Sequence, residues 1–500
     1  MKGGYTGKIL RVNLTTKAIS TIDTEKYIEF GGGHGIASAL FFDLVAEQLP
    51  FPAFDPRNVI TLMATPFSGT NMPGSGRCEV QGLGPMLYPI EWFGHSNFGG
   101  RFTAQLKYAG WDGIAVEGAS DEPVWINIIN DKVTIESAKG IWGMDTWDTQ
   151  EEIARRVIPS LKFGEWADVD AGYTTQIPAV VCCGPAGENM SRFGCLLHGP
   201  GSQAALCGFG GVFGSKKLKA ISVIGTGGVP IADPKAFMEA RLWFRQFQWD
   251  VDNPREAERF ARQGYMLISG RPSGGNVLNG QIPLVPARAA ACASCPRGCR
   301  MRLASAESNE SVCAGTMAVR VQGSQKLSRQ ANDLMQKLGL GHWQLMPVQS
   351  YVMSLYKRGI LGKGKQIDCD LPFDQSGTMG FADALLRQIA NRQGIGKDLA
   401  EGCARFAEKY GLLKEDLASG VLPLTYWGCS EHYDARVEVE WGFGSLFGER
   451  DLMLHMMANY PLHWMAQSGD PYLTAEEAAK LYTDAMVPYN GDIFMVDYGD

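Results

Sequence analysis

Hydrophobic residues in the first 225 positions recur mostly as short runs separated by glycine-containing turns, which is the pattern of consecutive β-strands. Residues 124–129 and 132–135 flank the dipeptide Asn130-Asp131, a pair that favours a hairpin turn. Further runs predict strands at 8–14, 58–62, 113–117, 179–181 and 220–224. We therefore expect a mostly β domain over residues 1–225.

After residue 225 the apolar positions change to helical spacing, first at 235–247 behind Asp233-Pro234. The clearest helix covers 343–356 and runs into Lys357-Arg358-Gly359, cations and a glycine that suit a helix C-terminus. This predicts a helical domain at 226–415 and the start of a second at 416–500, so the fold class is α+β. Residue 500 follows an apolar run, and we expect the natural protein to continue beyond it.

The charge balance excludes one class of protein. With 46 Lys and Arg against 53 Asp and Glu, the net charge of −7 provides no basic surface for a nucleic acid. The sequence has no apolar stretch near the roughly 18 residues of a membrane span, and its start lacks the apolar run of a secretory signal. We expect a cytoplasmic protein that acts on a small or acyl-type substrate.

Three of the 12 cysteines form the set C-x2-C-x3-C at Cys292, Cys295 and Cys299. Three thiolates at this spacing can hold one four-iron four-sulfur cluster, with a fourth ligand from elsewhere in the chain. A zinc site and chance clustering are the alternatives, although structural zinc sites usually pair two such units. The fourth ligand stays open, and a single cysteine is otherwise a small buried hydrophobe. The later cysteines are Cys313, Cys369, Cys403 and Cys429.

Glycine is enriched, with 61 of 500 residues, about 12% where ~7% is ordinary. Loops at 74–77, 94–101, 184–189 and 207–216 place glycines beside polar donors, which suits the approach of backbone N–H groups to a phosphorylated cofactor; plain β-turns are the alternative. The run at 31–35 is not G-x-G-x-x-G and no P-loop motif occurs, so both nucleotide-binding motifs are excluded. None of the seven histidines pair as H-x-x-x-H or H-x-H, which argues against a histidine-ligated metal.

Several segments together resemble the tungsten-containing aldehyde ferredoxin oxidoreductases. These segments are 6–14, 97–100, 106–114, 184–189 and 214–220. The resemblance implies tungsten, or molybdenum, held by two molybdopterins, and one four-iron four-sulfur cluster. It also implies a β base beneath the pterins with two helical domains over them, in agreement with the division predicted above.

The resemblance also assigns residues. Arg77 is similar to the arginine between cluster and pterin, and Asn97, Gly99 and Ala205 to pterin contacts. Three of the family's four cluster ligands correspond to Cys292, Cys295 and Cys299, and the fourth would lie beyond residue 500. The family's D-x-x-G-L-D pterin motif appears as residues 336–341, where Gly339 is retained and both acids are absent. His455 resembles the histidine near the metal, where it would move a proton; for this residue and for His432 a structural role is the alternative.

The leading hypothesis is an enzyme that oxidises aldehydes to carboxylates and passes electrons through the cluster to ferredoxin or an iron–sulfur partner subunit. Reduction of an aromatic acyl-CoA, of the benzoyl-CoA type, is the alternative within this class. A pterin-binding or electron-relay scaffold without catalysis is the alternative from another class. We expect an oligomer.

Overall fold

The structure is a computed structural model that describes residues 3–248 except 161, 163 and 171, then 286–295, 300–303, 310–311, 318–319, 321–422 and 476. The chain divides into two compact units. The first unit consists of Met1–Thr70, Gly76–Ala232 and Ala318–Ser430, and the second of Asn71–Ser75, Asp233–Met317 and Glu431–Asp500.

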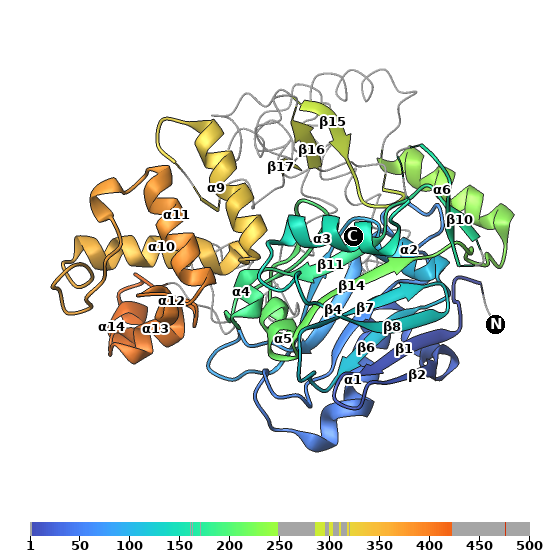
Figure 1. The fold of residues 1–500 in the computed structure, drawn as a ribbon, viewed down its shortest axis with the longest axis horizontal. Helices are drawn as coiled ribbons and strands as arrows, with labels where there is room; N and C mark the ends of the chain where they lie inside the picture. The colour runs from blue at the N-terminus through green and yellow to red at the C-terminus, as the bar shows by residue number, and fades with distance from the viewer. Residues whose placement is uncertain are drawn as a thin grey trace. The chain divides into compact units, whose positions relative to one another are not determined.

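Two six-stranded sheets form the β part of the first unit (Figure 1). The first sheet has the order β2-β1-β6-β3-β4-β5, from β1 (Lys8–Asn13), β2 (Ala18–Asp23), β3 (Ile60–Met63), β4 (Cys78–Leu83), β5 (Phe93–Phe98) and β6 (Gly113–Glu117). The second has the order β13-β12-β11-β14-β7-β8, from β7 (Val124–Ile129), β8 (Lys132–Ser137), β11 (Ala179–Cys183), β12 (Leu196–His198), β13 (Ser202–Ala204) and β14 (Leu218–Ile224). A separate pair is formed by β9 (Ala167–Val169) and β10 (Gly172–Thr174).

The predicted strands of this region are present. The predicted hairpin is β7 and β8, and Asn130 takes the left-handed backbone conformation (φ +53°) that such a turn requires. The segments at 179–181 and 220–224 pair as β11 and β14 in antiparallel register. Mixed parallel and antiparallel pairing arises because β1 lies parallel to β6, and β7 parallel to β14.

Successive residues of a strand point to opposite faces of the sheet, so the first sheet contacts two separate hydrophobic clusters. Leu10 faces a continuous core that contains residues of both sheets, including Leu62 and Ile221, whereas Ile9 faces a second cluster. In that second cluster, Ile36 and Leu40 of α1 (Gly33–Val45) cover the opposite face of the first sheet. Four more α-helices belong to this region: α2 (Phe102–Tyr108), α3 (Thr146–Val157), α4 (Pro185–Glu188) and α5 (Phe209–Ser215). Short 3-10 turns lie at η1 (Thr24–Phe30) and η2 (Ala46–Gln48).

The later part of the first unit is helical and lies to one side of the strands (Figure 1, yellow to orange). It contains α9 (Gln325–Leu338), α10 (His342–Lys357), η4 (Phe373–Gln375), α11 (Met379–Ala390), α12 (Gly396–Leu399), α13 (Cys403–Lys409) and α14 (Leu413–Ala418). The predicted helix at 343–356 is α10, and Gly359 after it has φ +72°, as expected of a C-terminal glycine.

The second unit contains α6 (Pro234–Gln248), whose first N–H groups are capped by the Asp233 carboxylate. A three-stranded sheet follows, with the order β15-β16-β17, from β15 (Pro286–Ala290), β16 (Arg300–Leu303) and β17 (Glu310–Ser311). The helical pattern after residue 225 did not predict this sheet. The fold class, β sheets followed by helices, is confirmed.

Candidate cofactor site

Two of the predicted pterin contacts, Asn97 and Ala205, come from different sheets that meet at their edges. The N–H of Leu206 donates to the Ser96 hydroxyl at 3.2 Å, and the Cys207 thiol donates to the His95 carbonyl at 3.2 Å. These two bonds fix the end of β5 beside the segment that follows β13. Residues 97–99 and 205 therefore belong to one neighbourhood although more than 100 positions separate them in the sequence.

Arg77 joins the same neighbourhood. It stands directly before β4, which pairs with β5 in a register that sets Cys78 opposite Phe98 and Glu79 opposite Asn97. The Arg77 guanidinium donates a hydrogen bond to the Asn97 side-chain oxygen. The structure thus brings together the arginine and the asparagine that the sequence placed at the pterin.

The turn between α9 and α10 packs against the same strands. Gly339 ends α9 in the left-handed conformation (φ +72°), and the N–H of Gly341 donates to the Phe193 carbonyl at 2.8 Å. A Cβ at Gly341 would lie 2.7 Å from the Ala205 carbonyl oxygen. The position that is acidic in the family motif therefore has no space for a side chain here.

The other missing acid of that motif is replaced by an amide network. Gln203 on β13 donates from its amide nitrogen to the Gln336 side-chain oxygen at 2.7 Å and to the Leu340 carbonyl at 3.2 Å. The Gln203 oxygen also lies 2.8 Å from Nδ1 of His342. Neutral hydrogen bonds hold this turn to the second sheet in place of carboxylates.

Arg101, which sequence analysis did not assign, is the second cation of the neighbourhood. Its Nη2 donates to the carbonyls of Ile177 (2.6 Å) and Pro178 (3.0 Å), while its buried Nη1 has no hydrogen-bond partner among the residues that the structure describes. Burial lowers the pKa of this guanidinium to about 10. A largely desolvated cation with an unused donor suits an anionic ligand. Its position directly after Gly99-Gly100 was the available signal.

Two cysteines of the set, Cys292 and Cys295, lie in the second unit, in the segment that follows β15. Cys292 and Cys295 are partly buried, and the N–H of Cys295 donates to the Cys292 carbonyl at 3.1 Å. Ser294 between them has φ +60°, so the chain turns tightly at this point. The turn therefore brings the backbones of Cys292 and Cys295 close together.

Several predicted residues lie outside the residues that the structure describes. These are Cys299, Cys313, Cys429, His432 and His455. Of the open choices for a fourth ligand, Cys369 and Cys403 are buried in the helical core, and burial raises the pKa of the Cys369 thiol. Both fit the alternative of a small buried hydrophobe.

Four motifs that carry the family resemblance are joined in two pairs within the fold. Glu188, from the loop at 184–189, forms a buried ion pair with Lys219, whose side chain is fully inaccessible. Asp112 forms a buried ion pair with Lys107 and accepts hydrogen bonds from the N–H groups of Thr6 (2.9 Å) and Gly7 (2.8 Å). These motif residues stabilise the base and do not line the junction of the sheets.

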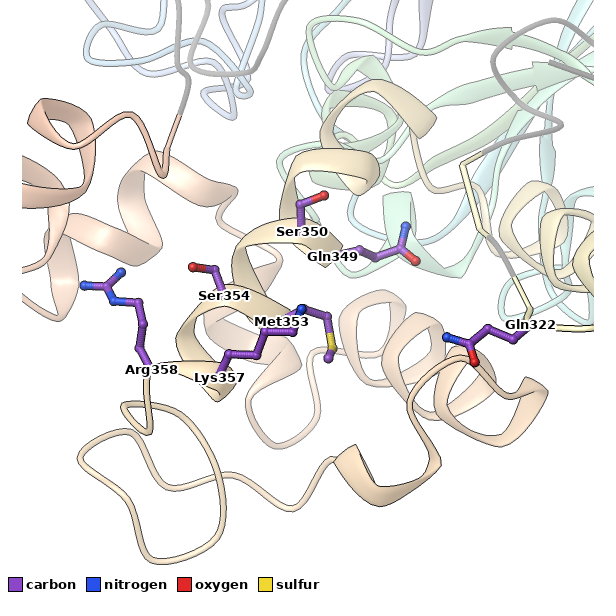
Figure 2. Close-up of a pocket in the computed structure, with 7 residues that line it drawn as sticks. All are labelled: Gln322, Gln349, Ser350, Met353, Ser354, Lys357 and Arg358. Atoms are coloured by element: carbon purple, nitrogen blue, oxygen red, sulfur yellow. The ribbon is translucent and has the colours of Figure 1, made fainter. Parts of the chain in front are cut away.

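A separate surface cavity of about 910 Å³ follows one side of α10. Figure 2 shows Gln349, Met353 and Lys357 on the helix with Gln322 across the opening. None of the residues assigned from the sequence lines this cavity.

Comparison with known proteins identifies the chain. The N-terminal domain of aldehyde ferredoxin oxidoreductase matches residues 9–225, and domains 2 and 3 of the same family match residues 272–486. The chain belongs to the aldehyde ferredoxin oxidoreductase family, and it is an oxidoreductase, as its motifs predicted.

Its relatives show where in the family it stands. It is 30% identical to the tungsten-containing aldehyde ferredoxin oxidoreductases of Pyrococcus furiosus and Thermococcus kodakarensis, over 82% of this chain and 68% of theirs. It is 25% identical to a WOR-like subunit of an aliphatic sulfonate oxidoreductase of Pyrococcus furiosus. These identities are consistent with a divergent branch, as the sequence indicated.

A solved structure shares the fold. The active-site complex BamBC of benzoyl coenzyme A reductase, in complex with 1,5-dienoyl-CoA, superposes with a TM-score of 0.69 at 24% identity. The match covers 86% of this chain and 66% of that one, so this chain spans just under two thirds of its length. Among the helices that the structure describes, none is both long and apolar enough to cross a membrane.

Proposed function

We propose that this protein is a tungsten, or molybdenum, bis-pterin oxidoreductase that oxidises aldehydes to carboxylates. The observation that carries the proposal is the junction of the two sheets, where Arg77 and the partly buried Arg101 flank the segment 97–99 at the end of β5. Two cations beside a glycine-containing segment suit the phosphates and polar edges of a pterin cofactor. Family membership supplies the second line of support.

The residues at the junction fit such a group. The buried Nη1 of Arg101 is a donor without a hydrogen-bond partner among the described residues. Because the chain as a whole is acidic, this pair of arginines is not part of a general basic surface. Asn97 and Gly99 offer contacts from β5, and Ala205 from the segment after β13. Gly339 sits in the turn that packs on Ala205.

When bound, the cofactor supplies two-electron oxidation of an aldehyde carbon, with the added oxygen taken from water. Arg101 and Arg77 neutralise its negative charge, and Arg77 also orients the Asn97 amide. Cys292, Cys295 and Cys299 would hold a four-iron four-sulfur cluster, which would supply one-electron transfer. His455 moves the proton that the reaction releases.

The electron acceptor in this proposal is ferredoxin or a ferredoxin-like iron–sulfur subunit, and the enzyme works as an oligomer in the cytoplasm under anaerobic conditions. The absence of a basic field and of a membrane-crossing helix in the described part of the chain agrees with a diffusible substrate. Aromatic acyl-CoA is the second substrate class. The fold match with the benzoyl-CoA reductase complex is the reason to test it.

The test uses anaerobically purified full-length protein. We expect tungsten or molybdenum together with about four irons per chain, and turnover of aldehydes with a viologen acceptor. Aroyl-CoA reduction with a reduced donor would establish the second class instead. Iron without tungsten or molybdenum would support the scaffold alternative, and zinc alone at the cysteine triplet would refute all three.

A variant pair tests the site itself. Arg101→Met should lower tungsten content, because a charge-assisted hydrogen bond contributes about 1.5–3 kcal/mol. Arg155→Met is the matched control, since Arg155 is a surface arginine paired with Glu151. Full tungsten loading of Arg101→Met would remove Arg101 from the site.

A further inference from the structure

A second group of potential ligands lies on the α1 side of the first sheet. Nδ1 of His34 and Nδ1 of His95 each lie 3.0 Å from the same carboxylate oxygen of Glu79. The three ligand atoms are all within 4.8 Å of one another, and the two rings meet edge to face at 4.8 Å between centroids. His95 and Glu79 are largely buried, with side-chain exposures of 6% and 13%, and His34 is half-buried.

Three different elements build this group. Glu79 and Gln81 point to the same face of β4, and Gln81 is opposite His95 on β5, so Glu79 and His95 are diagonal neighbours. His34 is in the first turn of α1. The helix can start this close because its glycines lack side chains: a Cβ at Gly32 would lie 2.3 Å from Pro66 Cδ, and one at Gly35 would lie 2.2 Å from the Phe30 carbonyl oxygen.

A glutamine holds the group in place. The Gln81 amide nitrogen donates to the Glu79 carboxylate and to the His34 carbonyl, both at 3.2 Å. Its oxygen accepts from the Ser38 hydroxyl, one turn further along α1, at 3.0 Å. Such outer contacts orient the ligands of metal sites and tune their affinity.

The chemistry of the donors selects the class of ion. Two imidazoles and one carboxylate suit Zn²⁺ or Fe²⁺, whereas Mg²⁺ and Ca²⁺ prefer oxygen ligands only. The neighbouring Cys78 thiol is buried in the core on the other face of the strand.

We propose that His34, Glu79 and His95 form a binding site for one divalent first-row transition ion, with Zn²⁺ as its test occupant. Three protein ligands leave a coordination position for water or for a further ligand. The ion would link α1 to β4 and β5, next to the Asn97 position that pairs with Glu79. The site does not depend on the proposed tungsten chemistry, and it is distinct from the cysteine loop.

Zinc analysis of the full-length protein tests the site. After equilibration with Zn²⁺ and removal of weakly bound metal, we expect about one zinc per chain with nitrogen and oxygen neighbours near 2.0 Å by X-ray absorption. Zinc at the cysteine loop would instead show sulfur neighbours near 2.3 Å, and Cys295→Ser should leave the first signal unchanged.

Variants assign the ligands. Glu79→Gln, His34→Asn and His95→Asn should each remove the nitrogen and oxygen signal, while Gln81→Leu should weaken zinc binding by about 10–100-fold. His342→Asn, which alters a histidine bonded to Gln203, is the matched control and should keep the zinc. Wild-type protein should also melt at a higher temperature with Zn²⁺ than after treatment with EDTA, which requires no variant to fold.

Three results would overturn the proposal: no zinc on the wild-type chain, zinc with sulfur neighbours only, or nitrogen-bound zinc that survives Glu79→Gln. In each case the group would be a buried hydrogen-bonded cluster without metal.

Discussion

Lys216, in the loop after α5, provides a test of stability against pH. Its side chain is fully buried, and the amine donates to the carbonyls of Pro56 (3.1 Å) and Gly118 (3.0 Å). Burial lowers its pKa from 10.5 to about 7, against the opposing charges of Glu117 and Asp55. A neutral amine has two hydrogens to donate, which the two carbonyls use.

The sign and size follow from proton linkage. Below about pH 7 the folded and unfolded chains both hold the Lys216 proton, so the free energy of unfolding does not change with pH through this group. Between about pH 7 and 10.5 the unfolded chain binds more protons, and stability rises with pH. Because one pKa unit corresponds to about 1.4 kcal/mol, the gain from pH 7 to pH 9 is roughly 2 kcal/mol.

Anaerobic urea unfolding at pH 7, 8 and 9 measures this gain. Lys216→Met cannot titrate, so the wild-type protein should gain roughly 2 kcal/mol relative to the variant over this range. Lys162→Met, at an exposed lysine, should follow the wild type. Parallel pH profiles for wild type and Lys216→Met would refute the reasoning that burial holds this lysine neutral.

Three further predictions follow from the contacts described above. Gly341→Ala places a Cβ 2.7 Å from the Ala205 carbonyl oxygen and should cost about 1–3 kcal/mol, seen as a lower melting temperature, while Gly228→Ala, with open space around it, should not. Glu188→Gln leaves Lys219 buried without its counter-charge and should cost about 3–5 kcal/mol in urea unfolding; a loss below about 1 kcal/mol would mean that the pair is solvated. Cys295→Ser should remove the cluster's electron paramagnetic resonance signal and its iron, and unchanged iron would rule out the cysteine loop as its site.

The sequence predicted the elements with strong periodicity. The strands now seen as β7, β8, β11 and β14 had short β-rich runs with turn residues between them, and α10 had a helical apolar stripe with a C-terminal glycine. The strand β15 reads Pro-Ala-Arg-Ala-Ala, with neither alternation nor β-branched residues, so local pattern could not reveal it. Tertiary pairing with β16 determines it instead.

The sequence predicted one of the two candidate sites and missed the other, because the missed group depends on tertiary pairing. Resemblance to the family assigns Asn97 and Ala205 to one cofactor, and the structure brings their segments into contact. The sequence argued against a histidine-ligated metal because no two histidines have the H-x-x-x-H or H-x-H spacing that places both on one face of a helix or strand. His34, Glu79 and His95 come from a helix and two strands, and only the register of β4 with β5 makes them neighbours.

The buried pairs Glu188–Lys219 and Asp112–Lys107 have a consequence for how relatives of this protein are recognised. The motifs that carry the family resemblance contain these pairs: Glu188–Lys219 joins two motifs, and Asp112 also accepts hydrogen bonds from the distant Thr6 and Gly7. These ion pairs do not depend on the substrate, whereas loss of one partner leaves a buried charge uncompensated and destabilises the fold. Two chains that share these motifs therefore share the same β-sheet fold. The residues that distinguish an aldehyde from an acyl-CoA lie outside these motifs.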